Sequence, residues 1–199
     1  MTQVRKKSVR QFSLVSGAAV RLITPDVLND YILPYAPLHP AYKYLSSVHR
    51  ADYLRTYFMH FHGGGYSDVK RTTGSWLPAF ETLKRNASIW VVGYPEAGPG
   101  DVVPSVRRNW KRVLGNCAYI CRPRTPFTTE WYSRMIALMD TKLAALQRHP
   151  AQTPRDMAGK SRYPIGWTQM LGSIFHPMSL KYSSHMSQAL PRSVFHDYE

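Results

Sequence analysis

The segment from Arg50 to Lys70, RADYLRTYFMHFHGGGYSDVK, constrains the fold more than any other part of this 199-residue chain. Its first part carries apolar side chains at helical spacing, which predicts a helix over 48–61 with one face on a core. Three glycines then stop that helix and permit positive φ or a close approach of the backbone. The residues 66–69 predict a short strand that ends near Asp68. We therefore expect a helix, a tight bend and a strand with an acid at its end.

A charged side chain, Arg55, falls inside the apolar stripe of the predicted helix. A guanidinium in that place cannot lose its proton and needs a carboxylate, a phosphate or water as its partner. Asp52, one helical turn earlier, is the nearest candidate. The sequence predicts this pair and leaves open whether its role is structural or functional.

The rest of the chain alternates predicted strands and helices, which indicates an α/β layered fold. We expect strands over 19–23, 88–94 and 116–121. Helices are predicted over 24–32, from Leu77 to Arg85, from a cap at Thr128 or Thr129 to Leu146, and within 163–177, where the last helix should end at His176 because Pro177 follows. The segment 8–16 reads as either a strand or a helix, and 149–162 is expected to be a mobile surface loop.

Composition limits the partners of the chain. Its length suits one domain over 1–199, and 26 Lys and Arg against 12 Asp and Glu give a formal charge of +14. An anionic partner is therefore expected: a nucleotide-sugar, a phospholipid surface or a nucleic acid. The sequence has no apolar run long enough for a membrane span and no signal-peptide pattern after its basic start. We expect a cytoplasmic protein, soluble or peripheral to a membrane.

Several functional classes lack their motifs here. Cys117 and Cys121 have no further Cys or His at zinc-site spacing, so reduced thiols are the simpler interpretation. The sequence contains no Gly-x-Ser-x-Gly elbow, no P-loop and no His-Glu-x-x-His helix, and the glycine triplet follows a helix, unlike a Rossmann fingerprint. The scarcity of acids disfavours a glycoside hydrolase, which needs a facing pair of carboxyl groups.

One family shares the spacing of the segment described above. Its pattern runs Asp-x-x-Arg, a gap, then Gly-Gly-x-Tyr-x-Asp-x-Asp, and this sequence matches it without an insertion at Asp52, Arg55, Gly63, Gly64, Tyr66 and Asp68. The chain thus resembles GT-A-fold glycosyltransferases with a sugar-binding Asp-X-Asp region, which include capsular polysaccharide synthesis proteins, fungal mannosyltransferases and short transferases of large DNA viruses. The resemblance implies a single-domain, Rossmann-like nucleotide-sugar-binding fold, minimal or shortened at the N-terminus if 8–16 is a helix.

The resemblance also implies an activity and a set of site residues. It implies transfer of a sugar, with retention of configuration, from a UDP- or GDP-sugar to a glycan or polysaccharide acceptor. Asp68 would be a catalytic residue that organises the metal and the diphosphate, and Gln169 a second catalytic candidate. Mn²⁺ or Mg²⁺ would bind Asp68 together with His176 or His185. The donor would be contacted or its site supported by Asp52, Arg55, Gly64, Gly65, Tyr66, Lys70 and Thr168.

The sequence departs from the family pattern at one position, because Lys70 stands where the second aspartate is expected. Two outcomes are physically reasonable: Asp68 alone keeps the metal with help from a histidine and water, which we favour, or the ammonium of Lys70 neutralises the diphosphate. A third is an inactive descendant of a transferase. From a different class, the charge and the segment 106–112, VRRNWKR, suggest a protein that binds an anionic polymer, although no nucleic-acid motif is present.

Overall fold

Four short strands form the centre of the protein, whose computed structural model describes residues 1–196. They are β1 (Gly64–Ser67), β2 (Val91–Pro95), β3 (Leu114–Cys121) and β4 (Met186–Ser187), in the order β1-β3-β2-β4. β3 pairs antiparallel with both β1 and β2, whereas β4 runs parallel to β2. The chain is thus one mixed α/β domain, as the alternation of elements predicts, but its small sheet is largely antiparallel.

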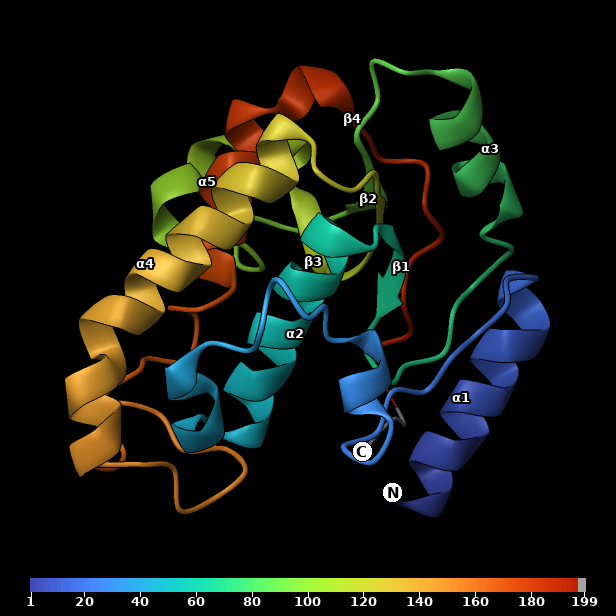
Figure 1. The fold of residues 1–199 in the computed structure, drawn as a ribbon. Helices are drawn as coiled ribbons and strands as arrows, with labels where there is room; N and C mark the ends of the chain where they lie inside the picture. Colours follow the sequence, from blue (N-terminus) through green and yellow to red (C-terminus); the bar gives the residue numbers. More distant parts are fainter. Residues whose placement is uncertain (197–199) are drawn as a thin grey trace.

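Helices cover both faces of this sheet (Figure 1). On one face lie α2 (Ser47–Phe61), α4 (Pro126–Arg148) and α5 (Gly172–Lys181), and on the other lie α1 (Gln3–Ser16) and α3 (Leu77–Arg85). The strands dictate this arrangement because their side chains alternate between faces. Tyr119 and Cys121 of β3 pack with Phe175 of α5, while Ala118 and Ile120 point to the other face.

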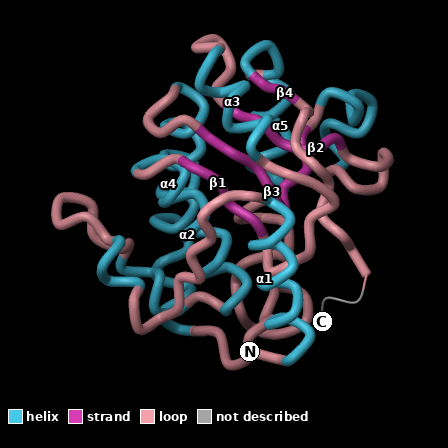
Figure 2. The backbone as a smooth tube through the Cα atoms, turned by 90° about the vertical axis from the view of Figure 1, so that its right-hand side faces the viewer, coloured by secondary structure: helices cyan, strands magenta, loops and turns pink. Residues whose placement is uncertain are grey.

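The two faces have different cores. Toward α2, α4 and α5 the core is rich in aromatic rings, and Tyr119 stacks on Phe175 with ring centroids 5.2 Å apart. Toward α1 and α3, Trp76 meets Phe12 edge to face at 4.9 Å. In Figure 2, which looks onto the second face, α1 crosses in front of β1 and β3.

Long periodic segments form the predicted elements. α2 begins after Ser46, whose side chain accepts a hydrogen bond from the backbone N–H of His49, and it ends at the glycines as expected. The predicted helix to Arg85 and the strands at 88–94 and 116–121 are also confirmed, with shifted ends. α4 is confirmed but is capped earlier than expected, because Thr125 and Thr128 cap each other reciprocally.

The N-terminal prediction is wrong in two places. Residues 19–23 form no strand, and the helix predicted over 24–32 is reduced to a 3₁₀ turn, η1 (Leu28–Tyr31). The segment 8–16 is helical, as part of α1, so the strand that would precede a nucleotide-binding helix is absent among residues 1–63. Phe12 explains the choice, because a helix buries its ring against Trp76.

The prediction that the last helix ends at His176 is also wrong, since α5 continues through Pro177 to Lys181. A proline inside a helix removes one backbone hydrogen bond and costs about 3 kcal/mol. Phe175 and Met178 flank it and are both buried in the core around Tyr119. Their burial outweighs the loss, which periodicity alone does not reveal.

Three further 3₁₀ helices connect these elements: η2 (Pro40–Tyr44), η3 (Pro104–Arg112) and η4 (Ser183–His185). The predicted surface loop over 149–162 contains turns and one isolated bridge between Ala158 and Ser161, without a helix or a strand. Within residues 1–196, no helix combines the length and the apolar character that crossing a bilayer requires.

Candidate functional site

The residues of the predicted motif meet where β1 ends. α2 presents Asp52 and Arg55 one turn apart, with 3.3 Å between Asp52 Oδ1 and Arg55 Nη2. The same Nη2 donates to Asp68 Oδ1 at 3.1 Å, across the bend made by the glycines. Arg55 therefore joins the helix to the first residue after the strand, which confirms the predicted Asp52–Arg55 pair and extends it.

Arg55 is held in one position by its whole surroundings. Its side chain is buried, its Nη1 donates to the carbonyl oxygen of Asn116 at 2.9 Å, and its guanidinium lies 4.4 Å from the ring centroid of Tyr66. Tyr66 in turn donates its hydroxyl to Asp68 Oδ1 at 2.9 Å and stacks on Tyr119. Tyr66 thus supports the strand end, as predicted, and fixes the Asp68 carboxylate.

Lys70 occupies the remaining oxygen of that carboxylate. Its Nζ donates to Asp68 Oδ2 at 2.8 Å and lies 3.8 Å from the Cys117 sulfur. The side chains of Lys70 and Arg55 are almost fully buried, while that of Asp68 is 24% exposed. Both oxygens of Asp68 therefore face cations, and the four charged side chains around β1 balance when all are ionised.

The two carboxyl groups of this network differ in their protonation. Burial raises the pKa of Asp52 to about 6, against the attraction of Arg55. Burial alone would also raise the pKa of Asp68, but the charges of Arg55 and Lys70 and the hydrogen bonds from Lys70 and Tyr66 hold it below its usual range. Asp68 hence stays ionised to a lower pH than an ordinary aspartate, whereas Asp52 takes up a proton in mild acid.

The glycines shape the backbone next to this network. Gly64 has a φ of 80°, and Gly65 leaves room for Trp76, whose ring would come within 3.0 Å of an added Cβ. Because Gly65 is bare, Trp76 closes over β1 on the face opposite Tyr66. Of the two predicted donor-binding glycines, Gly65 lines a cavity and Gly64 does not.

A cavity of about 150 Å³ lies between β1, α1 and α3, and Asp68 and Lys70 stand at its edge. Its walls are mostly apolar and aromatic, and they include an extended segment, 18–22, that carries Arg21. The lining residues are Val9, Phe12, Ala18, Ala19, Val20, Arg21, Leu22, Gly65, Ser67, Asp68, Val69, Lys70, Trp76 and Phe80. A mostly apolar cavity lined by a few charged residues is typical of a binding site for a small polar molecule.

The predicted metal site does not fit this arrangement. Lys70 and Arg55 place a positive charge on each oxygen of Asp68, at 2.8 and 3.1 Å, where a divalent cation would need those oxygens. Within residues 1–196, no three His, Cys, Asp or Glu side chains group as metal ligands do. The oxygens of Asp68 are thus occupied by cationic side chains.

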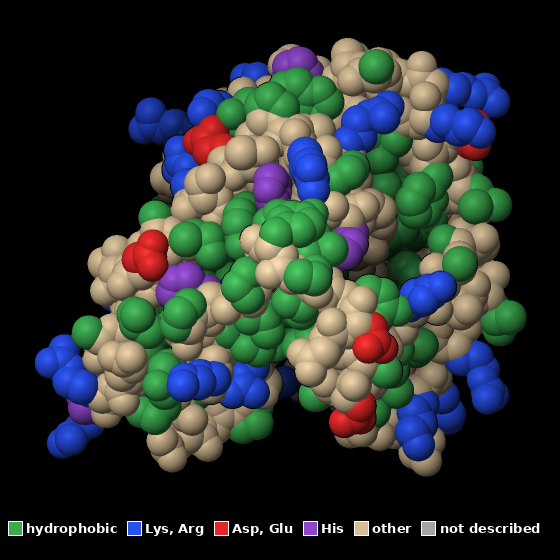
Figure 3. Space-filling model, viewed as in Figure 1, with side chains coloured by type: hydrophobic (Ala, Val, Ile, Leu, Met, Phe, Trp, Pro, Cys, Tyr) green, Lys and Arg blue, Asp and Glu red, His purple; other side chains and the backbone are tan. Residues whose placement is uncertain are grey.

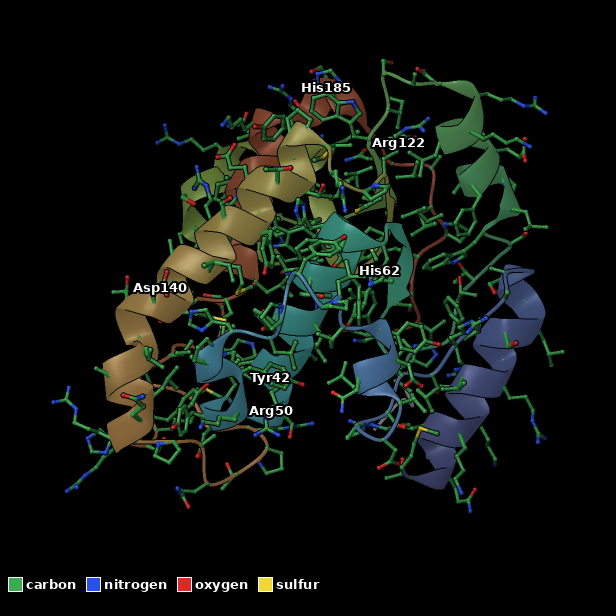
Figure 4. The ribbon with its side chains drawn as sticks, viewed as in Figure 1. Tyr42, Arg50, His62, Arg122, Asp140 and His185 are labelled. Carbon is green, nitrogen blue, oxygen red and sulfur yellow. The ribbon has the colours of Figure 1, made fainter. Side chains whose placement is uncertain are left out.

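The two histidines predicted as metal ligands lie elsewhere. His185 precedes β4, on the sheet edge opposite β1, three strand spacings or about 14 Å away. It stacks on Trp90 at 3.7 Å and donates to the carbonyl oxygen of Ser88, and Figure 4 places it at the top of the molecule. His176 of α5 accepts a hydrogen bond from the backbone N–H of Val103 at 3.2 Å. Neither histidine contacts Asp68.

The remaining candidates, Thr168 and Gln169, lie in the turn before α5. Gln169 uses its side-chain oxygen to accept the backbone N–H of Gly166, which stabilises a turn. Thr168 is exposed and pairs with Ser173 at 3.2 Å. A Cβ placed on Gly172 would lie 3.6 Å from Thr168 Cβ and 3.8 Å from Asn116 Nδ2. Thr168 and the Asn116 side chain thus both lie near Gly172, whereas Gln169 faces its own turn.

Sequence reasoning missed Asn116 and Cys117, which contact Arg55 and Lys70 from β3. A signal existed, because an asparagine interrupts the otherwise apolar strand LGNCAYIC. Burial raises the pKa of Cys117 to about 11, so its thiol stays protonated beside Lys70.

Comparison with known proteins adds no relative to this picture: no family model matches the sequence, and neither a curated protein nor a solved structure is significantly similar to it.

Proposed function

We propose that this chain is a nucleotide-sugar-dependent glycosyltransferase domain of the GT-A type, in which Lys70 takes over the charge of the usual divalent cation. The observation that carries the proposal is the convergence of the motif residues. Asp52, Arg55, Tyr66, Asp68 and Lys70 form one continuous network, and its two last members border a cavity.

The network explains how Lys70 would act on a donor. Asp68 holds the ammonium at 2.8 Å and is itself fixed by Arg55 and Tyr66, so the cation is positioned before a ligand arrives. Sugar transfer breaks the bond between the anomeric carbon and a diphosphate oxygen, and negative charge develops on that oxygen. A preorganised cation beside it stabilises the leaving group.

The size of the cavity indicates which part of a donor it takes. Its volume of about 150 Å³ is below the roughly 300–1,000 Å³ of complete small-molecule sites. Trp76, Phe80 and Phe12 offer apolar faces on which a sugar ring or a base packs. We assign the sugar or the base to this hollow, the diphosphate to Lys70, and the rest of the donor to the surface outside.

A binding experiment tests the proposal. UDP-, GDP- and CMP-sugars are titrated in EDTA and in Mn²⁺, with the melting temperature as readout, because a ligand that binds only the folded state raises it. We expect one donor class to bind in EDTA. Replacing Lys70 by Met should weaken that binding about 10- to 100-fold, the loss of one charge-assisted hydrogen bond.

The matched control is Lys84→Met, which removes an exposed lysine from α3 on the same side of the sheet. We expect it to bind the donor as the parent does. Absence of binding by every nucleotide-sugar, with and without Mn²⁺, would refute the proposed function. If donor binding required Mn²⁺ and were unchanged in Lys70→Met, the proposed transferase function would stand but the proposed role of Lys70 would be refuted.

The engagement of both Asp68 oxygens also supports a second candidate, an inactive descendant of a transferase. The variant Lys70→Asp restores the second acid of the family pattern. Donor hydrolysis that requires Mn²⁺ and appears only in this variant would favour the inactive descendant over the active enzyme.

A binding protein for an anionic polymer is the third candidate, and η3 is the observation that favours it. This element exposes four cations, Arg107, Arg108, Lys111 and Arg112, and none of them forms a salt bridge within residues 1–196. A steep salt dependence for single-stranded nucleic acid, without a response to any nucleotide-sugar, would select this function.

A further inference from the structure

Exposed apolar side chains concentrate on one part of the surface. Of the eleven large apolar side chains that are exposed within residues 1–196, seven belong to the first 27 residues: Met1, Val4, Leu14, Val15, Val20, Leu22 and Val27. Leu14 is the extreme case, with 78% of its surface in contact with solvent. Single exposed apolar residues are ordinary, but a group of them marks an interaction surface.

The same part of the surface is strongly basic. α1 carries Arg5, Lys6, Lys7 and Arg10 and no acidic residue. None of these four cations forms a salt bridge in the part of the chain that the structure describes. Figure 3 shows Lys and Arg side chains beside hydrophobic ones at the lower right, over α1. The partner must therefore combine negative charge with an apolar interior.

A groove separates α1 from the segment 18–22. It has a volume of about 360 Å³. Most of its lining is aliphatic and includes two cations: Met1, Lys6, Val9, Arg10, Ser13, Leu14, Val20 and Leu22. Cations that flank exposed aliphatic side chains match the two layers of a bilayer surface, where lipid phosphates lie above the acyl chains. A nucleic acid would use the cations but would leave the aliphatic side chains in water.

We propose that α1 and the segment 18–22 bind the surface of an anionic phospholipid bilayer. Lys6, Lys7 and Arg10 lie among the headgroup phosphates, and Leu14 and Leu22 enter the boundary with the acyl chains. This surface adjoins the candidate site, because Val9, Val20 and Leu22 line both the groove and the cavity beside Asp68 and Lys70. Membrane binding would hold that cavity next to the bilayer. The membrane proposal does not depend on which donor the candidate site takes.

Sedimentation with lipid vesicles tests this proposal on the full chain. Vesicles of phosphatidylcholine with about one third phosphatidylglycerol are compared with pure phosphatidylcholine, at low and at high salt. We expect binding only to the anionic vesicles, and we expect Lys6→Gln/Arg10→Gln to reduce the partition coefficient about 30-fold, from two lost cations near a charged lipid surface. Leu14→Ser/Leu22→Ser should reduce it at both salt concentrations, because it removes the inserted side chains.

The control removes the same charge from another surface. Arg107→Gln/Arg108→Gln in η3 leaves α1 untouched, and its partition coefficient should stay within about threefold of the parent value. Circular dichroism and the melting temperature establish that each variant is folded. Equal losses in the α1 and η3 variants would show attraction by net charge alone and would overturn the proposal. A lack of binding to anionic vesicles would also overturn the proposal. The same holds if single-stranded nucleic acid displaces the protein from vesicles and Leu14→Ser/Leu22→Ser does not change this displacement.

Discussion

Replacing Arg55 by Met removes the charge at the centre of the network while it keeps much of the volume of the side chain. The change leaves Asp52, which is 3% exposed, without its cation and leaves the carbonyl of Asn116 without its donor. Removing one partner of a buried ion pair costs about 3–5 kcal/mol. We expect a loss of that size at pH 8, a large part of the 5–15 kcal/mol that is typical for a domain.

The loss should depend on pH in a defined direction. The native pKa of Asp52 is about 6 against 3.8 for the ordinary group, so the folded state binds more protons between these values. The free energy of unfolding therefore falls as pH rises through 6, by about 3 kcal/mol in total. Arg55→Met removes the cation that opposes this shift, so the pKa of Asp52 rises further and the fall extends to higher pH.

Asp68 adds a part of the loss that does not differ between pH 5 and pH 8. Arg55 helps to hold its pKa below the usual range, and the stability that this provides is present above the unfolded pKa and is lost in acid. In Arg55→Met, only Lys70 and Tyr66 remain to lower the pKa of Asp68. Asp52 thus predicts a larger loss from Arg55→Met at pH 8 than at pH 5, whereas the contribution of Asp68 is present at both pH values.

Urea denaturation followed by tryptophan fluorescence measures these quantities, because Trp76 and Trp131 are buried in the two cores. Arg85→Met is the control, since the Arg85 side chain is 81% exposed and pairs with Glu81 on the surface of α3. We expect the control to lose less than about 1 kcal/mol. If Arg55→Met lost no more stability than the Arg85→Met control at both pH values, the proposed role of the network in stability would be refuted.

Two further substitutions test other parts of the fold. Glu96 is buried beside His176, with 3.8 Å between Glu96 Oε1 and His176 Nε2, and burial with the nearby charge of Asp101 raises its pKa to about 7. Ionisation of Glu96 therefore lowers the free energy of unfolding by about 3 kcal/mol as pH rises from about 4.5 through 7. In urea titrations, Glu96→Gln should be more stable than the parent at pH 8 but not at pH 4.5. Gly63 has a φ of 66°, and an added Cβ would lie 2.6 Å from Pro123 Cδ. Gly63→Ala should thus lose about 1–3 kcal/mol in the same assay, and an unchanged midpoint would show that the bend before β1 is not as described.

The parts of the fold that could be predicted from the sequence are those with a local cause. α2 and α4 have apolar side chains at helical spacing over four or more turns, and β3 is a run that only a buried strand explains. The segment 19–23 has the same apolar character but lies over α1 instead of joining the sheet. Its state depends on the ring of Phe12 and on tertiary packing, which periodicity does not record.

The candidate site shows the same division. Helical spacing predicted the Asp52–Arg55 pair, and the resemblance to the transferase family implied that Tyr66 and Asp68 belong to the same site. Neither predicted the pairing of Lys70 with Asp68, since the direction of a long side chain depends on Cys117 and the neighbouring strand. The proposed ligands His176 and His185 depended on the strand order, which no local pattern reveals.

The charge at position 70 decides how this site would handle a diphosphate. A lysine in place of the expected aspartate changes the local charge from −1 to +1, a difference of two units. That difference equals the charge of the divalent cation that the two acids of the family pattern would bind. The field that a diphosphate would meet at the end of β1 is thus similar for an acid pair with a metal ion and for Asp68 with Lys70. Arg55, anchored by Asp52 and Asn116, is what allows a lone aspartate to hold that lysine in place.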